Sequence, residues 1–293
     1  MLITSELAFE IAGISLLYRY SEPIVVEEDW PIHHFLCAKD EYDIINDISF
    51  EPNFGYKQIT DKAPAVAMPS YSIYLQDELT MIVFTPGTPN PVAISVLYNG
   101  YSSVRTIVMD RSYTKQPLPL CVTGFLLQYV LATRNEGFIM HGATWTNETN
   151  GTGIVFTGNS GVGKSTISQI FRENTTWKQI SDDRIFVKIS SRGYRAFGNP
   201  FDYKIQRISN ESTDIKHLFF LHHSSENCIK AVEHGEKIRR LLTICLLPYW
   251  DSIHLRRASV RLSNFSQGLK MYDLYFRPDN DIVSLVLKTI DTI

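Results

Sequence analysis

The sequence predicts a mixed α/β protein in which a β-rich N-terminal part precedes a C-terminal part of alternating strands and helices. Short apolar runs separated by turn residues fill positions 1–115, where we expect no helix. From about residue 120, helix-spaced and strand-like apolar runs alternate, which is typical of an α/β layer. A composition with 44% apolar and 20% charged residues is that of a globular chain. We therefore expect two domains, 1–115 and 120–293.

Five runs in the N-terminal part fit strands: Ile14–Tyr20, Ser70–Leu75, Met81–Phe84, Ala93–Leu97 and Val104–Met109. The first two alternate apolar and polar residues, as half-buried strands do, and the third is continuously apolar. Asn99-Gly100 stands between the last two runs and predicts a hairpin. No motif in this part points to catalysis, and we expect the domain to be substrate-selecting.

The polar segment 110–119 contains two prolines and is the predicted linker. The elements expected after it are a helix over 121–133 stopped by Gly137, a strand over 138–145, a strand over 153–157, a helix beginning at Lys164, and a strand around 180–187.

One motif carries chemistry. Residues 158–165 read GNSGVGKS, which fits G-x-x-x-x-G-K-[ST] between a predicted strand and a predicted helix. Glycines let backbone N–H groups point at phosphate, and the helix N-terminus adds a favourable dipole. The residues expected to bind the nucleotide are Gly158, Asn159, Ser160, Gly161, Val162, Gly163, Lys164, Ser165 and Thr166. In this pattern Lys164 reaches the β- and γ-phosphates and Ser165 holds Mg²⁺. The structural alternative is an ordinary glycine-rich turn.

An acidic pair, Asp182-Asp183, follows the motif. Asp183 lies 19 residues after Lys164, enough for one helix and a return strand. One carboxylate can hold Mg²⁺ while the other accepts a proton from an incoming hydroxyl; the alternative is a polar strand end. The chain lacks the DxxG and [NT]KxD strings of GTPases and the LSGGQ of transport ATPases. His141 precedes the motif by 17 residues, and a buried structural histidine is its alternative reading.

The order His141-Gly142, GNSGVGKST over 158–166 and SDDRIFV over 181–187 resembles the catalytic core of the HPr kinase/phosphorylase family. It is closer to the HPr kinase-related proteins, including the serine kinases found with lasso-peptide clusters, and the superfamily is structurally akin to phosphoenolpyruvate carboxykinase. The resemblance covers about residues 120–293, and the segment 272–280 is similar to the way these kinases end. The segment 195–201 stands where HPr kinases have a second glycine-rich signature with a metal-binding Glu, which argues against HPr as the acceptor.

The resemblance implies a P-loop catalytic domain of HPr-kinase/PEP-carboxykinase type, with a tendency to form homo-oligomers. It implies that Lys164 contacts the phosphates, that Ser165 and Asp182 serve Mg²⁺, that Asp183 is the general base and that His141 is an active-site polar group. The roles of Asp182 and Asp183 could be exchanged.

We therefore expect an ATP-dependent phosphotransferase that uses ATP and Mg²⁺ and phosphorylates a serine or other alcohol of a peptide, protein or small molecule. The alternatives are a nucleotide-binding regulatory module without transfer and carboxykinase-type chemistry. A formal charge of −3 excludes a broad nucleic-acid-binding surface. No apolar run approaches the ~20 residues of a membrane span. Four scattered cysteines and an N-terminus without basic residues predict a cytoplasmic protein.

Overall fold

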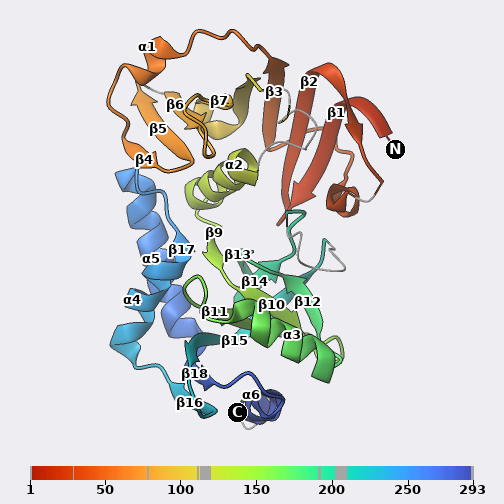
Figure 1. The fold of residues 1–293 in the computed structure, drawn as a ribbon, viewed down its shortest axis with the longest axis vertical. Helices are drawn as coiled ribbons and strands as arrows, with labels where there is room; N and C mark the ends of the chain where they lie inside the picture. The colour runs from red at the N-terminus through yellow and green to blue at the C-terminus, as the bar shows by residue number, and fades with distance from the viewer. Residues whose placement is uncertain are drawn as a thin grey trace. The chain divides into compact units, whose positions relative to one another are not determined.

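The computed structural model describes residues 2–28, 30–77, 79–110, 112, 120–190, 193–201 and 210–291. The protein is a mixed α/β molecule with two large sheets (Figure 1). It divides into an N-terminal unit, Met1–Arg134 with Pro248–Leu255, and a C-terminal unit, Asn135–Leu247 with Arg256–Ile293. Residues 120–134 thus group with the N-terminal sheet. The ranges 1–115 and 120–293 stay a prediction for the extent of the two functional domains. The predicted linker lies outside the described residues, apart from Asp110 and Ser112.

The N-terminal unit contains an eight-stranded sheet of order β1-β2-β3-β8-β7-β6-β5-β4. Its strands are β1 (Leu2–Ile11), β2 (Ile14–Val26), β3 (Ile44–Phe50), β4 (Val66–Met68), β5 (Tyr71–Gln76), β6 (Leu79–Phe84), β7 (Ala93–Tyr98) and β8 (Ser103–Val108). All five predicted strands are present, and the predicted hairpin is the antiparallel β7–β8 pair. Within the described residues, the expectation of no helix is wrong for three short elements: η1 (Pro31–Phe35), α1 (Lys57–Thr60) and η2 (Asn99–Tyr101). They lie in connections, where single helical turns are common.

Helix α2 (Leu120–Thr133) confirms the helix expected over 121–133. Because it is apolar on all sides, it must be covered all round. The ring of Phe125 lies 4.5 Å from the Tyr71 ring of the sheet and 5.7 Å from Trp250 of the 248–255 segment, measured between centroids. The predicted stop at Gly137 is wrong: the helix ends at Thr133, and Asn135 adopts the left-handed conformation (φ 59°) that ends it.

The C-terminal unit contains a ten-stranded sheet with the main order β12-β10-β11-β15-β14-β13-β9-β17, and β18 pairs with β15 and β16. The strands are β9 (Gly137–His141), β10 (Ala143–Thr146), β11 (Thr152–Thr157), β12 (Lys178–Ser181), β13 (Arg184–Ser190), β14 (Gly193–Phe197), β15 (Ser212–His223), β16 (Cys228–Ala231), β17 (Cys245–Leu246) and β18 (Lys270–Phe276). Strands β11, β15 and β18 are parallel neighbours, so their carboxyl ends lie at one edge of the sheet.

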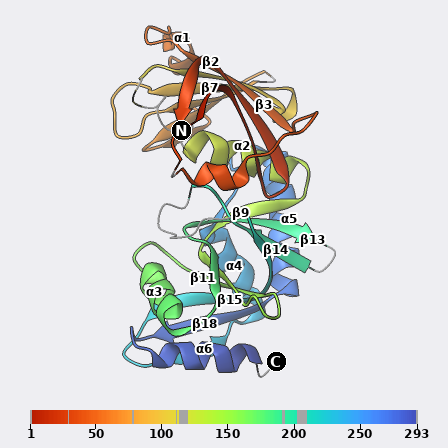
Figure 2. The same ribbon diagram turned by 90° about the vertical axis from the view of Figure 1, so that its right-hand side faces the viewer.

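Helices α3 (Lys164–Asn174) and α6 (Asp281–Asp291) cover one face of this sheet, as Figure 2 shows for α6 beside β18. Their apolar stripes share one core with the sheet, and Phe171, Phe156, Phe219 and Val286 are fully buried in it. Helix α4 (His234–Ile244) contacts side chains of the opposite face, and α5 (Ser252–Gly268) packs Phe265 against Phe138. Within the described residues, no helix is long and apolar enough to cross a membrane.

Two predicted strands are each two strands. Residues 138–145 break at Gly142, between β9 and β10, and a Cβ atom there would lie 2.9 Å from both the Phe156 carbonyl oxygen and Ile185 Cδ1, so the break requires glycine. The 180–187 run breaks at Asp182-Asp183, which form the turn between β12 and β13. Alternation of apolar residues cannot reveal either break because both halves are buried strands.

Candidate functional site

The loop 158–163 connects the end of β11 to the start of α3, as the motif predicts (Figure 1). Gly158, Gly161 and Gly163 have φ values of 147°, 80° and 97°, a region that residues with side chains rarely adopt. At Gly163 the space is also closed, because an added Cβ would lie 2.7 Å from Cζ of Phe276. The glycines are therefore required by the course of this loop.

Lys164 is the first residue of α3, and its side chain turns back over the loop. The Nζ atom donates to the carbonyl oxygens of Gly158, at 2.8 Å, and Asn159, at 3.0 Å. Ser165 and Thr166, in the first turn of α3, are exposed. A positive charge and two hydroxyl groups therefore lie at the junction of loop and helix.

Two residues at strand ends, His223 and Phe276, contact the glycine-rich loop, and neither was among the predicted site residues. His223 ends β15, and its Nε2 lies 3.1 Å from the carbonyl oxygen of Gly161. Because a carbonyl only accepts, this nitrogen carries a proton. The ring of His223 stacks on Phe276, which ends the parallel neighbour β18. The apolar runs that precede both residues mark them as strand ends, but only the parallel pairing brings them under the loop.

His141 and Asp183 meet beside the start of the loop. The hydroxyl of Thr157, the residue before Gly158, donates to the carbonyl oxygen of His141 at 2.5 Å. The Nδ1 atom of His141 lies 3.0 Å from the Asp183 carbonyl oxygen and 3.8 Å from its Oδ1. The carbonyl contact requires a proton on Nδ1. Their side chains are 40% and 60% exposed, so solvent or a ligand can reach both.

The acidic turn holds Asp183 in an unusual conformation, with φ at 67°. Its N–H donates to Oδ1 of Asp182 at 3.1 Å, and its carbonyl accepts the N–H of Gly142 at 3.2 Å. Asn199, which is buried, donates to the carbonyl oxygen of Arg184 at 2.9 Å and fixes the other side of the turn. This conformation is uncommon for a residue other than glycine and occurs at turns as well as at functional sites. Asn199 was not among the predicted site residues.

The two carboxylates of the pair have different surroundings. Asp182 is buried, whereas Asp183 projects into an exposed position next to His141. Within the described residues, no three His, Cys, Asp or Glu side chains form a group that could hold a metal by themselves. Arg195, on β14, forms an ion pair with Asp214 at 2.9 Å.

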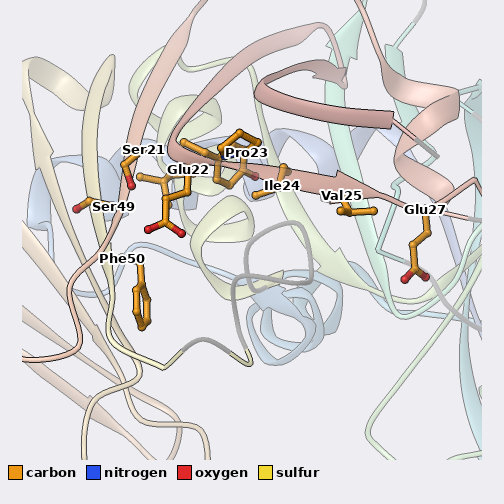
Figure 3. Close-up of a pocket in the computed structure, with 10 residues that line it drawn as sticks. Ser21, Glu22, Pro23, Ile24, Val25, Glu27, Ser49 and Phe50 are labelled. Carbon is orange, nitrogen blue, oxygen red and sulfur yellow. The ribbon is translucent and has the colours of Figure 1, made fainter.

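A separate cavity of about 410 Å³ lies in the N-terminal unit (Figure 3). It lies beyond the last pair of the β2–β3 ladder, Tyr20 and Ile48, where the two strands are no longer paired. Glu22 and Phe50 line it from the two strands. It contains none of the predicted site residues.

No protein-family model matches the chain, and no curated protein sequence matches it. Among solved structures, the chain is similar to the Hpr(Ser) kinase/phosphatase from Coxiella burnetii, with a TM-score of 0.28 and 10% sequence identity. The match covers 53% of this chain and 94% of that chain. The similarity is distant and transfers no residue role to this protein.

Proposed function

We propose that this protein is an ATP-dependent phosphotransferase that moves the γ-phosphate to a serine or other alcohol of a peptide, protein or small molecule. The observation that carries the proposal is the chain of contacts from Thr157 through His141 to Asp183. It joins the strand that leads into the glycine-rich loop to a carboxylate held with a left-handed backbone. Phosphoryl transfer needs this combination of a phosphate cradle and a nearby proton acceptor.

The loop 158–163 and the first turn of α3 would bind the phosphates of ATP. The left-handed glycines of the loop remove side chains from the concave side, and the eleven-residue helix α3 directs its N-terminal dipole at the loop. Lys164 already bonds two carbonyl oxygens of the loop, so its ammonium is positioned where phosphate oxygens would replace them. Ser165 and Thr166 add hydroxyl donors.

Mg²⁺ would be held by the hydroxyl of Ser165 and the carboxylate of Asp182. Both are hard oxygen ligands, which Mg²⁺ prefers, and in nucleotide sites it commonly takes only one or two protein ligands together with phosphate oxygens. Two candidate ligands on the protein therefore fit the ion. When bound, it would neutralise charge on the phosphates.

Asp183 would act as the general base. It would take the proton of the acceptor hydroxyl while the hydroxyl oxygen bonds to the γ-phosphorus and the bond from that phosphorus to the bridging oxygen of ADP breaks. The Nδ1–H of His141 holds the Asp183 turn through its carbonyl and would keep the carboxylate directed at the acceptor. We propose that the N-terminal domain selects the acceptor.

The test is transfer of label from γ-labelled ATP with Mg²⁺, with a cell extract as the source of acceptors. Lys164→Ala and Asp183→Asn are compared with the wild type, and Asp40→Asn is the control for loss of an exposed carboxylate. We expect label on an acceptor with the wild type and the control only, and unchanged ATP affinity in Asp183→Asn. ATP binding without transfer by the wild type would overturn the proposal in favour of a nucleotide-binding module.

A further inference from the structure

The C-terminal unit has a second cavity, of about 340 Å³, at the sheet edge opposite the glycine-rich loop. It lies where the parallel strands β11, β15 and β18 begin, and Thr152, His217 and Lys270 line it from these three strands. The loop follows the other ends of the same strands. From His217 to His223 the strand spans roughly 20 Å, so this cavity is not part of the site described above. Its size suits a small molecule.

His217 is an unexplained polar group in this cavity. The residue is only 7% exposed, and its Nδ1 is buried without a hydrogen-bond partner in the described part of the chain. Buried polar atoms in native structures nearly always have partners. A buried nitrogen without a proton is tolerated better than an orphaned N–H, which places the proton on Nε2. Because His217 lines the cavity and its Nδ1 is enclosed, Nε2–H is the ring group left to face the cavity.

The charges around His217 are mainly positive. Lys216 and Lys270 line the cavity, are exposed, and form no ion pair within the described residues. Burial, reinforced by the charges of these two lysines, lowers the pKa of His217 to about 4. Asp291, at the end of α6, is the acidic residue in the lining. Two cations face one carboxylate, so the cavity has a net positive charge.

Amide groups add to this donor set. Asn147 and Asn150 line the cavity, and their side-chain oxygens accept the backbone N–H groups of Thr149 and Thr152 at 2.9 Å each. This use of the oxygens leaves each NH₂ group as the donor end. Trp177 and Leu269 supply apolar wall. Donors and cations in a partly apolar cavity are complementary to an anion carried on a small organic molecule.

We propose that this cavity is a binding site for a small organic anion, a carboxylate or phosphate ester, whose charged group is held by Lys216, Lys270 and the Nε2–H of His217. The proposal is independent of the phosphotransferase activity, because none of these residues belongs to the glycine-rich loop or the acidic turn.

The test is isothermal titration calorimetry at pH 7 with inorganic phosphate and, separately, with succinate. All variants carry Lys164→Ala, which disables the glycine-rich loop as a competing phosphate site. Lys216→Met and Lys270→Met are the test substitutions. Lys230→Met, on β16 of the same unit and outside the cavity lining, is the control for the loss of one positive charge.

We expect at least one of the two anions to bind the Lys164→Ala protein, and each test substitution to weaken binding by about tenfold or more, as loss of a charge-assisted hydrogen bond would. Preference for phosphate or succinate tells which type of anion the site takes. Absence of binding by both anions would overturn the proposal, as would equal weakening by Lys230→Met. Because the three lysines are exposed, their replacement does not disturb the core.

Discussion

At the scale of single residues, Asp183 combines an exposed carboxylate with a left-handed backbone conformation. Its carboxylate is exposed beside His141, and its backbone has a φ of 67°. The left-handed conformation is unfavourable for a residue with a side chain and costs glycine little. Glycine would therefore adopt this backbone conformation at a lower cost than Asp183 does.

Replacement of Asp183 by glycine should raise the free energy of unfolding by about 0.5–1 kcal/mol and abolish phosphoryl transfer. Asp183→Asn is the matched variant, because asparagine tolerates the same backbone conformation but cannot accept a proton. It should leave stability unchanged and lower turnover by about 10²–10⁴-fold. Urea unfolding and the labelled-ATP assay measure the two effects. A destabilised Asp183→Gly protein would mean that the carboxylate has a structural role instead.

Sequence reasoning reaches some of these residues and not others. Lys164 and Ser165 follow from a local motif, and the structure has the loop and helix that the motif requires. The pairing of His141 with Asp183 depends on the register of β9 against β13, which places His141 opposite Arg184. No local pattern contains that register. His223, Phe276 and Asn199 were missed for the same reason, since each acts across strands distant in sequence.

At the scale of elements, the glycine-rich loop is shaped by the ends of β15 and β18 as much as by its own glycines. Gly163 has no room for a side chain because Phe276, which is buried, lies against it. Gly161 has a similar backbone conformation but open space around its Cα. An alanine at Gly161 would therefore test backbone strain alone, whereas an alanine at Gly163 would test strain together with the steric clash against Phe276.

Gly163→Ala should therefore lower the free energy of unfolding by about 1–3 kcal/mol more than Gly161→Ala, the excess being the cost of displacing a packed ring. Thermal or urea unfolding of both variants measures the difference. Adding Phe276→Leu removes the Cζ atom and should recover part of the excess in Gly163→Ala, and none of the loss in Gly161→Ala. Equal losses in the two alanine variants would show that strain alone accounts for the requirement.

His217 is buried near the start of β15. The charges of Lys216 on β15 and Lys270 on β18 act on its ring, Tyr272 stacks on it, and Asp291 of α6 lines the same cavity. Its pKa is about 4 in the folded protein against 6.5 ordinarily. Between these values the unfolded chain binds a proton that the folded protein does not. The contribution of neutral His217 to stability is therefore complete above pH 6.5 and declines as the pH falls to 4, by on the order of 3 kcal/mol.

His217→Gln removes this titration, so its stability should fall less than that of the wild type between pH 6.5 and 4. Urea midpoints of both proteins at pH 7, 5 and 4 give the comparison, and carboxylates that titrate in both proteins cancel in the difference. Parallel pH profiles would show that His217 is protonated in the folded state at its ordinary pKa.

The spacing of apolar residues in the sequence predicted the type of most strands and helices, but not where each of them ends. Most of the run Ser70–Leu75 became part of strand β5, but its burial does not follow the predicted alternation, since the neighbours Ile73 and Tyr74 are both buried and Leu75 is 48% exposed. The segment 138–145 did not become one strand, because β9 ends at His141 and β10 begins at Ala143, with Gly142 at a position where Phe156 and Ile185 leave no room for a side chain. The type of most elements could therefore be predicted from the sequence, whereas the break between two buried strands at Gly142 could not.

At the scale of the whole molecule, the segment 248–255 departs from the chain order. Its position in the sequence is within the C-terminal part, yet it belongs to the N-terminal unit. Tyr129 of α2 donates its hydroxyl to Asp251 at 2.5 Å and stacks on Trp250. The segment 248–255 thus packs on the Phe125 and Tyr129 side chains of α2. No composition shift or motif in the sequence marks this return.

Trp250→Ala should therefore destabilise the N-terminal unit, by about 2–4 kcal/mol, because it removes aromatic contacts with both Phe125 and Tyr129. Hydrogen exchange followed by mass spectrometry gives the location of the effect. Amides of α2 should lose protection, while those of β11 and β15, which lie in the core of the other unit, should keep theirs. Ile253→Ala is the control on the same segment, since Ile253 is 64% exposed. Loss of protection in β11 and β15 with α2 unchanged would assign the segment 248–255 to the C-terminal unit instead.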